Sequence, residues 1–444
     1  MPRSTARLHM RPRRTDGLDG VVYIMALIFL VGADLFRVLL EAGPITSGLK
    51  LAMLFPMLFW VISNGRYVVR GLVAVPEIAA LLGLATISVL WSAYPDQTLE
   101  RLIPLWITTS MALALGSKLS LRTLLIAVGI LATITVLSCF LAVALIPSAR
   151  GVPPWEDAWR GTFSHKNGMG ASCMFMMIYA LSAAVVTKGK LRRFFLFICL
   201  GAIVLLVASQ SRTSQGIAIV SMTAFLSGLA LHRWATFWGL LYVGGLILAI
   251  SAAFFLFSTQ IITPVFDLLG REPTLSGRLP LWEATWPYVM ERPWFGYGYK
   301  AFWEPDAVAV IKISLDPQIG YISHYSHSGL IELMLDTGLV GTVIFATLLL
   351  RLFLTVSAGF RDHAARPMLI CTLVIVIAFI LLNVLESSIL SRESLSWMIF
   401  STVATKLGNI ARAQRHASRQ ARIRNRPGAR NRRSDLAPTR PRPA

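Results

Sequence analysis

Long apolar segments recur along this chain of 444 residues and are separated by polar ones. Most are roughly 17–25 residues long, the length that an α-helix needs to cross a hydrocarbon core of ~30 Å. Within a bilayer, only helices and closed barrels satisfy all of their backbone hydrogen bonds. Charged residues make up 14% of the sequence, against about 25% in a soluble domain. The sequence therefore predicts an all-α fold, a polytopic bundle of membrane-spanning helices.

These segments divide the chain into five regions. We expect a basic N-terminus at 1–20, nine transmembrane helices within 21–258, a large loop at 259–328, three further transmembrane helices within 329–410 and an Arg-rich tail at 411–444. The twelve expected helices cover residues 21–40, 44–63, 72–91, 102–117, 121–147, 164–186, 194–210, 214–231, 236–258, 329–350, 367–385 and 393–410.

Basic residues alternate between the loops, and this alternation predicts the orientation of the chain. The formal net charge is +20, and the cations concentrate in 1–20, in every second loop and in 411–444. Because cytoplasmic loops are enriched in Lys and Arg, we expect both termini in the cytoplasm and the loop 259–328 on the other side. A disordered tail attracted to anionic lipid headgroups accounts for the charge of 411–444, so no nucleic-acid partner is predicted.

The loop at 259–328 is the longest polar break in the sequence, and short helices are expected within it. Residues 278–290 have apolar residues at helical spacing, which predicts an interfacial helix. The loop combines a cation, two tryptophans and two imidazoles: Arg278, Trp282, Trp286, His324 and His327. Such a set of side chains at a membrane surface suits the binding of a sugar that is attached to a lipid phosphate.

Two more polar segments lie at the expected outer ends of helices. Arg212 stands among five small polar side chains, where a guanidinium is suited to bidentate binding of a phosphate. The alternative is an arginine that only reaches the membrane interface. Lys166 and Asn167 open the helix at 164–186 on the same face. They bind phosphate or sugar hydroxyls, or they serve as an anchoring lysine and part of a helix cap.

His327 precedes the expected helix at 329–350, and His324 lies three residues earlier. A neutral imidazole is able to take a proton from a sugar hydroxyl, while the alternative is a simple interfacial histidine. No metal site is predicted, because no cysteine lies nearby and the His-Glu-x-x-His spacing is absent. Glu332 and Asp336 share a face of the following helix, and we interpret them as an outward-facing acidic patch rather than as bases.

Six short motifs follow one another along the chain. They are Trp-Ser-x-x-Pro at 91–95, Phe-x-His-Lys-Asn at 163–167, Ser-x-Ser-Arg-Thr at 209–213, Gly-Arg-x-x-x-Trp at 277–282, Arg-Pro-Trp-Phe-Gly-Tyr-Gly at 292–298 and His-Ser-Gly-Leu-Ile-Glu-Leu-x-x-x-x-Gly-Leu-x-Gly at 327–341. This order, with twelve expected helices and one large late loop, resembles the O-antigen ligase and Wzy-type polysaccharide polymerase superfamily. The resemblance covers about residues 75–345 and is strongest to exopolysaccharide polymerases of the succinoglycan type. It departs at Ser328, where many members have Asn, and this difference bears on acceptor binding.

The resemblance implies an inverting glycosyltransferase of the bacterial inner membrane whose active site faces the periplasm. Its donor would be an oligosaccharide on undecaprenyl diphosphate, an activated leaving group that requires neither cofactor nor metal. The family's functional arginines would fall on Arg212 and Arg278, which neutralise the leaving diphosphate, and its histidine on His327, which orients or deprotonates the acceptor hydroxyl. The residues expected to bind the substrate are Lys166, Asn167, His324, Trp282 and Trp286. Other expected partners are membrane lipids, a chain-length regulator and export machinery.

The function predicted from these features is polymerisation of lipid-linked repeat units into exopolysaccharide or O-antigen. One alternative is an O-antigen ligase that transfers the glycan to lipid A-core, since ligases and polymerases share the motifs. A second is a transporter or flippase for the lipid-linked sugar. Transporters usually show paired halves with interrupted helices at the membrane midplane, whereas the polar residues here gather at one face. A scaffold protein is a third alternative.

Overall fold

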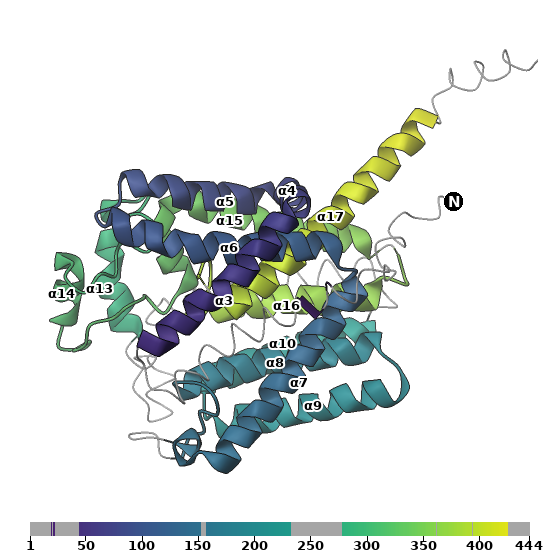
Figure 1. Ribbon diagram of the computed structural model, residues 1–444, viewed down its shortest axis with the longest axis horizontal. Helices are drawn as coiled ribbons and strands as arrows, with labels where there is room; N and C mark the ends of the chain where they lie inside the picture. Colours follow the sequence, from purple (N-terminus) through teal and green to yellow (C-terminus); the bar gives the residue numbers. More distant parts are fainter. Residues whose placement is uncertain are drawn as a thin grey trace, which may run out of the picture.

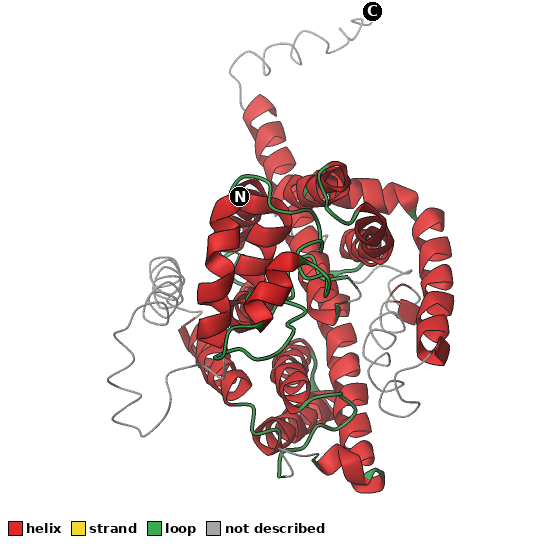
Figure 2. Ribbon diagram, turned by 90° about the vertical axis from the view of Figure 1, so that its left-hand side faces the viewer, coloured by secondary structure: helices red, strands yellow, loops and turns green. Residues whose placement is uncertain are grey.

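The computed structural model describes residues 19, 21–22, 44–151, 157–231, 278–360, 362–392 and 394–424. Within these residues the regular secondary structure is entirely helical (Figure 2), which confirms the all-α prediction. Several predicted segments lie outside the described residues. They are the helix at 236–258, nearly all of 1–40, the first part of the large loop at 259–277 and the tail beyond residue 424.

Most of the helices agree with the predicted ranges to within a few residues. The α-helices are α3 (Pro44–Ser63), α4 (Gly65–Ala74), α5 (Pro76–Ile87), α6 (Pro95–Lys118), α7 (Leu121–Leu145), α8 (Lys166–Val186), α9 (Gly189–Ala208), α10 (Arg212–Leu231), α13 (Arg278–Glu291), α14 (Val308–Ser314), α15 (Gly329–Gly359), α16 (Arg366–Leu385) and α17 (Leu395–Arg424). Two short 3-10 helices, η1 (Ser88–Leu90) and η2 (Pro147–Arg150), follow α5 and α7. The prediction for 278–290 is confirmed as a helix, α13, which continues through Pro287.

Six of the described helices are long and apolar enough to cross a membrane: α7, α8, α9, α10, α15 and α16. The number rises to seven if the bent pair of α4 and α5 counts as one span. The bend of 104° falls at Val75, because the following Pro76 disfavours helical geometry in the residue before it. The structure therefore supports a bundle of several spans, while the predicted number of twelve stays a prediction.

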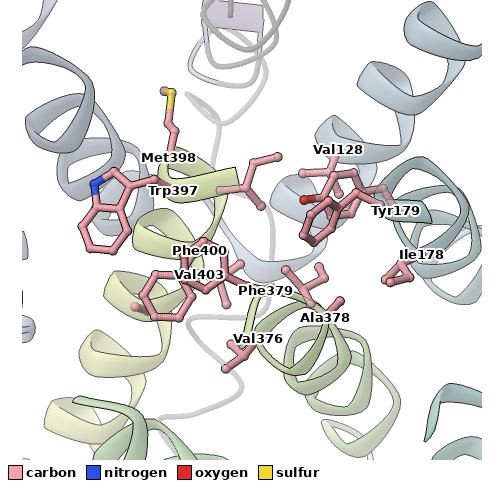
Figure 3. Close-up of a cluster of buried hydrophobic side chains, with 14 of the residues drawn as sticks. Val128, Ile178, Tyr179, Val376, Ala378, Phe379, Trp397, Met398, Phe400 and Val403 are labelled. Atoms are coloured by element: carbon pink, nitrogen blue, oxygen red, sulfur yellow. The ribbon is translucent and has the colours of Figure 1, made fainter. Parts of the chain in front are cut away.

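Part of the buried core is an aromatic cluster where α16 and α17 meet (Figure 3). Phe379 and Phe400 stack with ring centroids 4.3 Å apart, and Trp397 lies against Phe400 at 5.7 Å. The fully buried indole of Trp397 donates a hydrogen bond to the hydroxyl of Thr109 in α6 at 2.9 Å. In a membrane, close packing and interhelical hydrogen bonds of this kind hold helices together.

The large loop folds onto the start of α15. Figure 1 shows α13 and α14 at one end of the bundle. There an apolar cluster joins both helices to α15. The cluster contains Leu281, Val289, Phe302, Trp303, Val310, Ile331 and Leu335. Inside α15, Gly338 leaves the helical conformation with φ at +66°, and a Cβ there would lie 2.3 Å from the backbone of Trp294. Glycine thus lets the loop dock into a break in α15, where Leu339 donates its N–H to Pro293 at 2.7 Å.

The helices run between two ends of the bundle. At one end, which we call the site end, the starts of α8 and α17 and the end of α16 line a cavity together with the segment before α15. At the opposite end, α15 and α17 line a second cavity that contains three arginines, and we call it the arginine pocket. From that end α17 runs out of the bundle (Figure 1) and continues to Arg424, so residues 411–424 are helical rather than part of a disordered tail.

Candidate functional site

A cavity of about 600 Å³ lies at the site end. Its polar lining comes from four separate parts of the chain: Ser164, His165, Asn167, Ser172, Tyr325, His327, Glu386, Ser388, Ser394 and Ser396. The remaining lining is mostly apolar: Phe163, Gly168, Ala171, Phe175, Tyr179, Leu382 and Leu395. Its volume, its apolar walls and its few converging ionisable groups are typical of a small-molecule site.

His327 is held in this cavity in a strained backbone conformation. Its φ of +52° falls in the left-handed region, which residues other than glycine rarely adopt. The preceding Ser326 fixes the segment, because its backbone N–H and its hydroxyl both donate to Oε2 of Glu332 at 3.0 Å. The imidazole lies against the ring of Tyr325, with centroids 4.3 Å apart. Such strain persists only where surrounding contacts hold the backbone in place, so the segment before α15 fixes the orientation of the His327 side chain.

Glu386 links the imidazole of His327 to a buried arginine. Its Oε1 accepts a hydrogen bond from Arg278 at 2.8 Å, and its Oε2 lies 3.8 Å from Nδ1 of His327. Arg278 opens α13 and is only 8% exposed. Glu386 directly follows α16, where the side chain of Asn383 accepts two backbone N–H groups of the next turn. A carboxylate in this position stabilises the positive charge of Arg278 and of any proton that His327 takes up.

His165 is a second imidazole of the same cavity. It caps the N-terminus of α8, since its Nδ1 accepts the backbone N–H of Asn167 at 3.2 Å. Burial lowers the pKa of His165 below its usual value, and the charge of the adjacent Lys166 lowers it further. Glu386 acts on this pKa in the opposite direction. Its position as the cap of α8 also presents the positive end of the helix dipole to the cavity.

Arg212 and Lys166 open two neighbouring helices, α10 and α8. The two helices meet closely, because a Cβ at Gly170 of α8 would lie 2.4 Å from the side chain of Ser211. Arg212 is exposed and does not line the cavity. The structure thus places these two cations side by side at the site end, at the margin of the cavity rather than inside it.

The other expected binding residues are placed differently from one another. Asn167 lines the cavity. Trp282 donates its indole N–H to the backbone oxygen of Ser326 at 2.8 Å, so it holds the segment that carries His327. Trp286 is 47% exposed and His324 is exposed, and neither lines the cavity.

Sequence reasoning left two residues of the cavity, His165 and Glu386, out of the expected site. Two sequence features could have identified them: His165 lies inside the motif at 163–167, and Glu386 is a carboxylate at the end of a long apolar helix. The interpretation of Glu332 and Asp336 as an outward-facing patch was wrong. Both are nearly fully buried and bind the ammonium group of Lys300 at 2.8 and 3.1 Å.

The comparisons with known proteins agree with this architecture. Residues 194–346 match the Wzy_C family, which is described as O-antigen ligase. Over 280 residues the chain is 25% identical to the exopolysaccharide production protein ExoQ of Rhizobium meliloti. This alignment covers 61% of this chain and 62% of that protein. The alignment thus spans less than two thirds of the relative's length. The matched region contains Arg212, Arg278 and His327 within an all-helical membrane bundle, and in this region the chain is similar to the O-antigen ligase and Wzy-type polysaccharide polymerase superfamily.

Proposed function

We propose that this protein polymerises oligosaccharide repeat units carried on undecaprenyl diphosphate. The observation that carries the proposal is the cavity at the site end, where His327, Glu386 and His165 face one another beside Arg278. A base and a set of cations at the surface of a membrane bundle are what transfer from a lipid diphosphate requires.

The donor diphosphate would lie at the start of α8, the start of α10 and Arg278. The N-terminus of a helix binds anions through its free N–H groups and its dipole. Lys166 and Arg212 add two cations at these helix starts. Arg278 is suited to a phosphate oxygen because a guanidinium carries five N–H donors, one of which binds Glu386. These groups stabilise the negative charge that grows on the diphosphate as it leaves.

The acceptor would be the terminal sugar hydroxyl of a second chain, placed against His327. Its oxygen forms a bond to the anomeric carbon of the donor, while the bond from that carbon to the phosphate oxygen breaks. The hydroxyl proton passes to the imidazole of His327, whose Nδ1 is buried on the side of Glu386. Glu386 stabilises the resulting imidazolium across 3.8 Å. Attack opposite the departing diphosphate inverts the anomeric centre, and undecaprenyl diphosphate is released.

The location of basic residues at the end opposite the cavity supports the same proposal. Lys118 and Arg351 lie at the end opposite the cavity, where Lys118 binds Asn64 at 2.9 Å and Arg351 binds Ala74 at 2.9 Å. By the positive-inside rule that end would face the cytoplasm. The cavity would then open to the periplasm of a bacterial inner membrane, and a chain-length regulator and export machinery would be partners on that side.

Polysaccharide analysis in a deletion strain tests this function. The strain is complemented with wild type, His327→Ala or Arg278→Ala, with equal protein abundance in the membrane. Polymerisation predicts that the strain and both variants lose long chains and accumulate single repeat units. Long chains that remain on undecaprenyl diphosphate would indicate a ligase instead. Normal polysaccharide in both variants would remove the catalytic assignment and favour a transporter.

A further inference from the structure

The arginine pocket has a volume of about 620 Å³ and lies at the end of the bundle opposite the proposed active site. Its residues come from two helices: Arg351, Leu354, Thr355 and Ala358 from α15, and Ala411, Gln414, Arg415, Ser418 and Arg419 from α17. No aspartate or glutamate is among these lining residues of the described chain. Three guanidinium groups around one cavity form a site that favours an anion.

One of the three positive charges is already compensated. Arg351 binds the carboxylate of Glu77 at 2.7 Å and the backbone oxygen of Ala74 at 2.9 Å, which fixes its guanidinium at the pocket wall. Three arginines less one glutamate leave two positive charges, which belong to Arg415 and Arg419. Two guanidinium groups match a phosphate, because each is able to donate two parallel hydrogen bonds to its oxygens.

The walls of the pocket indicate an amphiphilic ligand rather than a soluble anion. Leu354 lines the pocket and is 55% exposed, and Leu350 one turn earlier on α15 is 59% exposed. Ala358 and Ala411 complete the apolar side. α15 is one of the helices that are apolar enough to span the membrane, and the arginines lie near its end, at the expected depth of lipid headgroups.

We propose that the arginine pocket binds the phosphodiester headgroup of an acidic membrane phospholipid, with the acyl chains along the exposed leucines of α15. The bound lipid connects α17 to α15 beyond the core of the bundle. This site is independent of the proposed glycosyl transfer, since none of its residues belongs to the cavity at the site end.

Native mass spectrometry of the purified full-length protein tests the proposal, with phosphatidylglycerol and phosphatidylcholine of equal acyl length as probes. The pocket variant carries Arg415→Gln and Arg419→Gln. The matched control carries Arg192→Gln and Arg193→Gln, two exposed arginines at the start of α9 that lie outside the pocket. Gel filtration verifies that both variants stay folded, as expected for exposed positions.

Wild type and the control are expected to retain phosphatidylglycerol over phosphatidylcholine, and the pocket variant to lose this retention by about tenfold or more. If both variants lost this retention equally, phosphatidylglycerol would be attracted by the overall positive charge and not by the arginine pocket. Equal retention of the two lipids would exclude an acidic headgroup. Displacement of phosphatidylglycerol by an equal concentration of glycerol phosphate would point to a soluble anion, and each of these results overturns the proposal.

Discussion

Replacing Glu332 by Gln removes a buried negative charge that four donors share. The Oε2 atom accepts hydrogen bonds from the indole of Trp303 at 3.1 Å and from the backbone N–H and hydroxyl of Ser326 at 3.0 Å. The Oε1 atom accepts one from Lys300 at 2.8 Å. Because Glu332 is 2% exposed, water does not replace these contacts. Ser326 precedes His327, so we predict a loss of both stability and synthesis.

The size of the loss follows from the geometry. The amide oxygen of Gln is able to keep the three donors on the Oε2 side, but without the charge that strengthens them. The amide N–H₂ then faces the ammonium group of Lys300, two donors in contact, although Lys300 keeps Asp336 at 3.1 Å. Breaking a buried ion pair costs about 3–5 kcal/mol, and the retained contacts favour a value of about 3. At about 2 °C per kcal/mol for a large domain, the melting temperature falls by about 6 °C.

The assay is thermal unfolding of the purified protein in detergent, followed by tryptophan fluorescence, together with complementation of a deletion strain. The control is Glu283→Gln, an exposed glutamate on α13. A Glu332→Gln protein that melts with wild type would refute the energetic argument. A protein that melts early but makes normal polysaccharide at equal abundance would show that Glu332 does not position His327.

Three further predictions follow from single contacts. Glu386→Gln is expected to lower the rate of glycosyl transfer from a lipid-linked donor about tenfold, because the imidazolium formed at His327 loses a partially exposed carboxylate 3.8 Å away. An unchanged rate in purified protein would contradict this role. The pKa of His165 is lower in the folded chain than in the unfolded chain, so on acidification the unfolded chain binds a proton at this residue first. The contribution of His165 to stability is therefore present above about pH 6.5 and is lost as the pH falls. His165→Asn keeps a cap acceptor and should melt with less dependence on pH between pH 7 and 5 than wild type; an equal dependence would assign the effect to other groups. Trp397→Phe removes the hydrogen bond to Thr109 and is expected to lower stability by about 1 kcal/mol, which unfolding in denaturant measures against Trp294→Phe, an exposed tryptophan.

Hydropathy predicted the helices well because the span length is fixed by the membrane and leaves a clear apolar run. Hydropathy predicted two helix boundaries incorrectly, for different reasons. Residues 411–424 are too polar for a span, yet they contain Ala, Arg and Gln, which favour helix and continue α17 beyond its apolar part. The run at 72–91 was read as one helix, whereas Pro76 places a bend of 104° between α4 and α5.

The site could be predicted only where a motif marked it. His327 and Asn167 were predicted from their sequence context and line the cavity, while the roles assigned to them stay predictions. Contacts between side chains from distant segments could not be predicted, because they leave no pattern in the spacing of apolar residues along the sequence. Glu332 was interpreted as exposed because its partner, Lys300, comes from a loop whose path the sequence does not reveal. The same holds for Glu386, which reaches His327 only because α16 ends at the level where α15 begins.

The placement of Glu386 between Arg278 and His327 bears on how one cavity would serve an anionic donor and a general base in the proposed reaction. Without donor, the carboxylate compensates the buried guanidinium, which is only 8% exposed. A diphosphate that binds Arg278 would take over part of this compensation, and the carboxylate would then be free to stabilise a proton on His327. In the proposed reaction, the base would thus gain more electrostatic support once the leaving group is in place. Arg278 and His327 would therefore act as a coupled pair through Glu386, and their substitutions should be less than additive in the transfer rate.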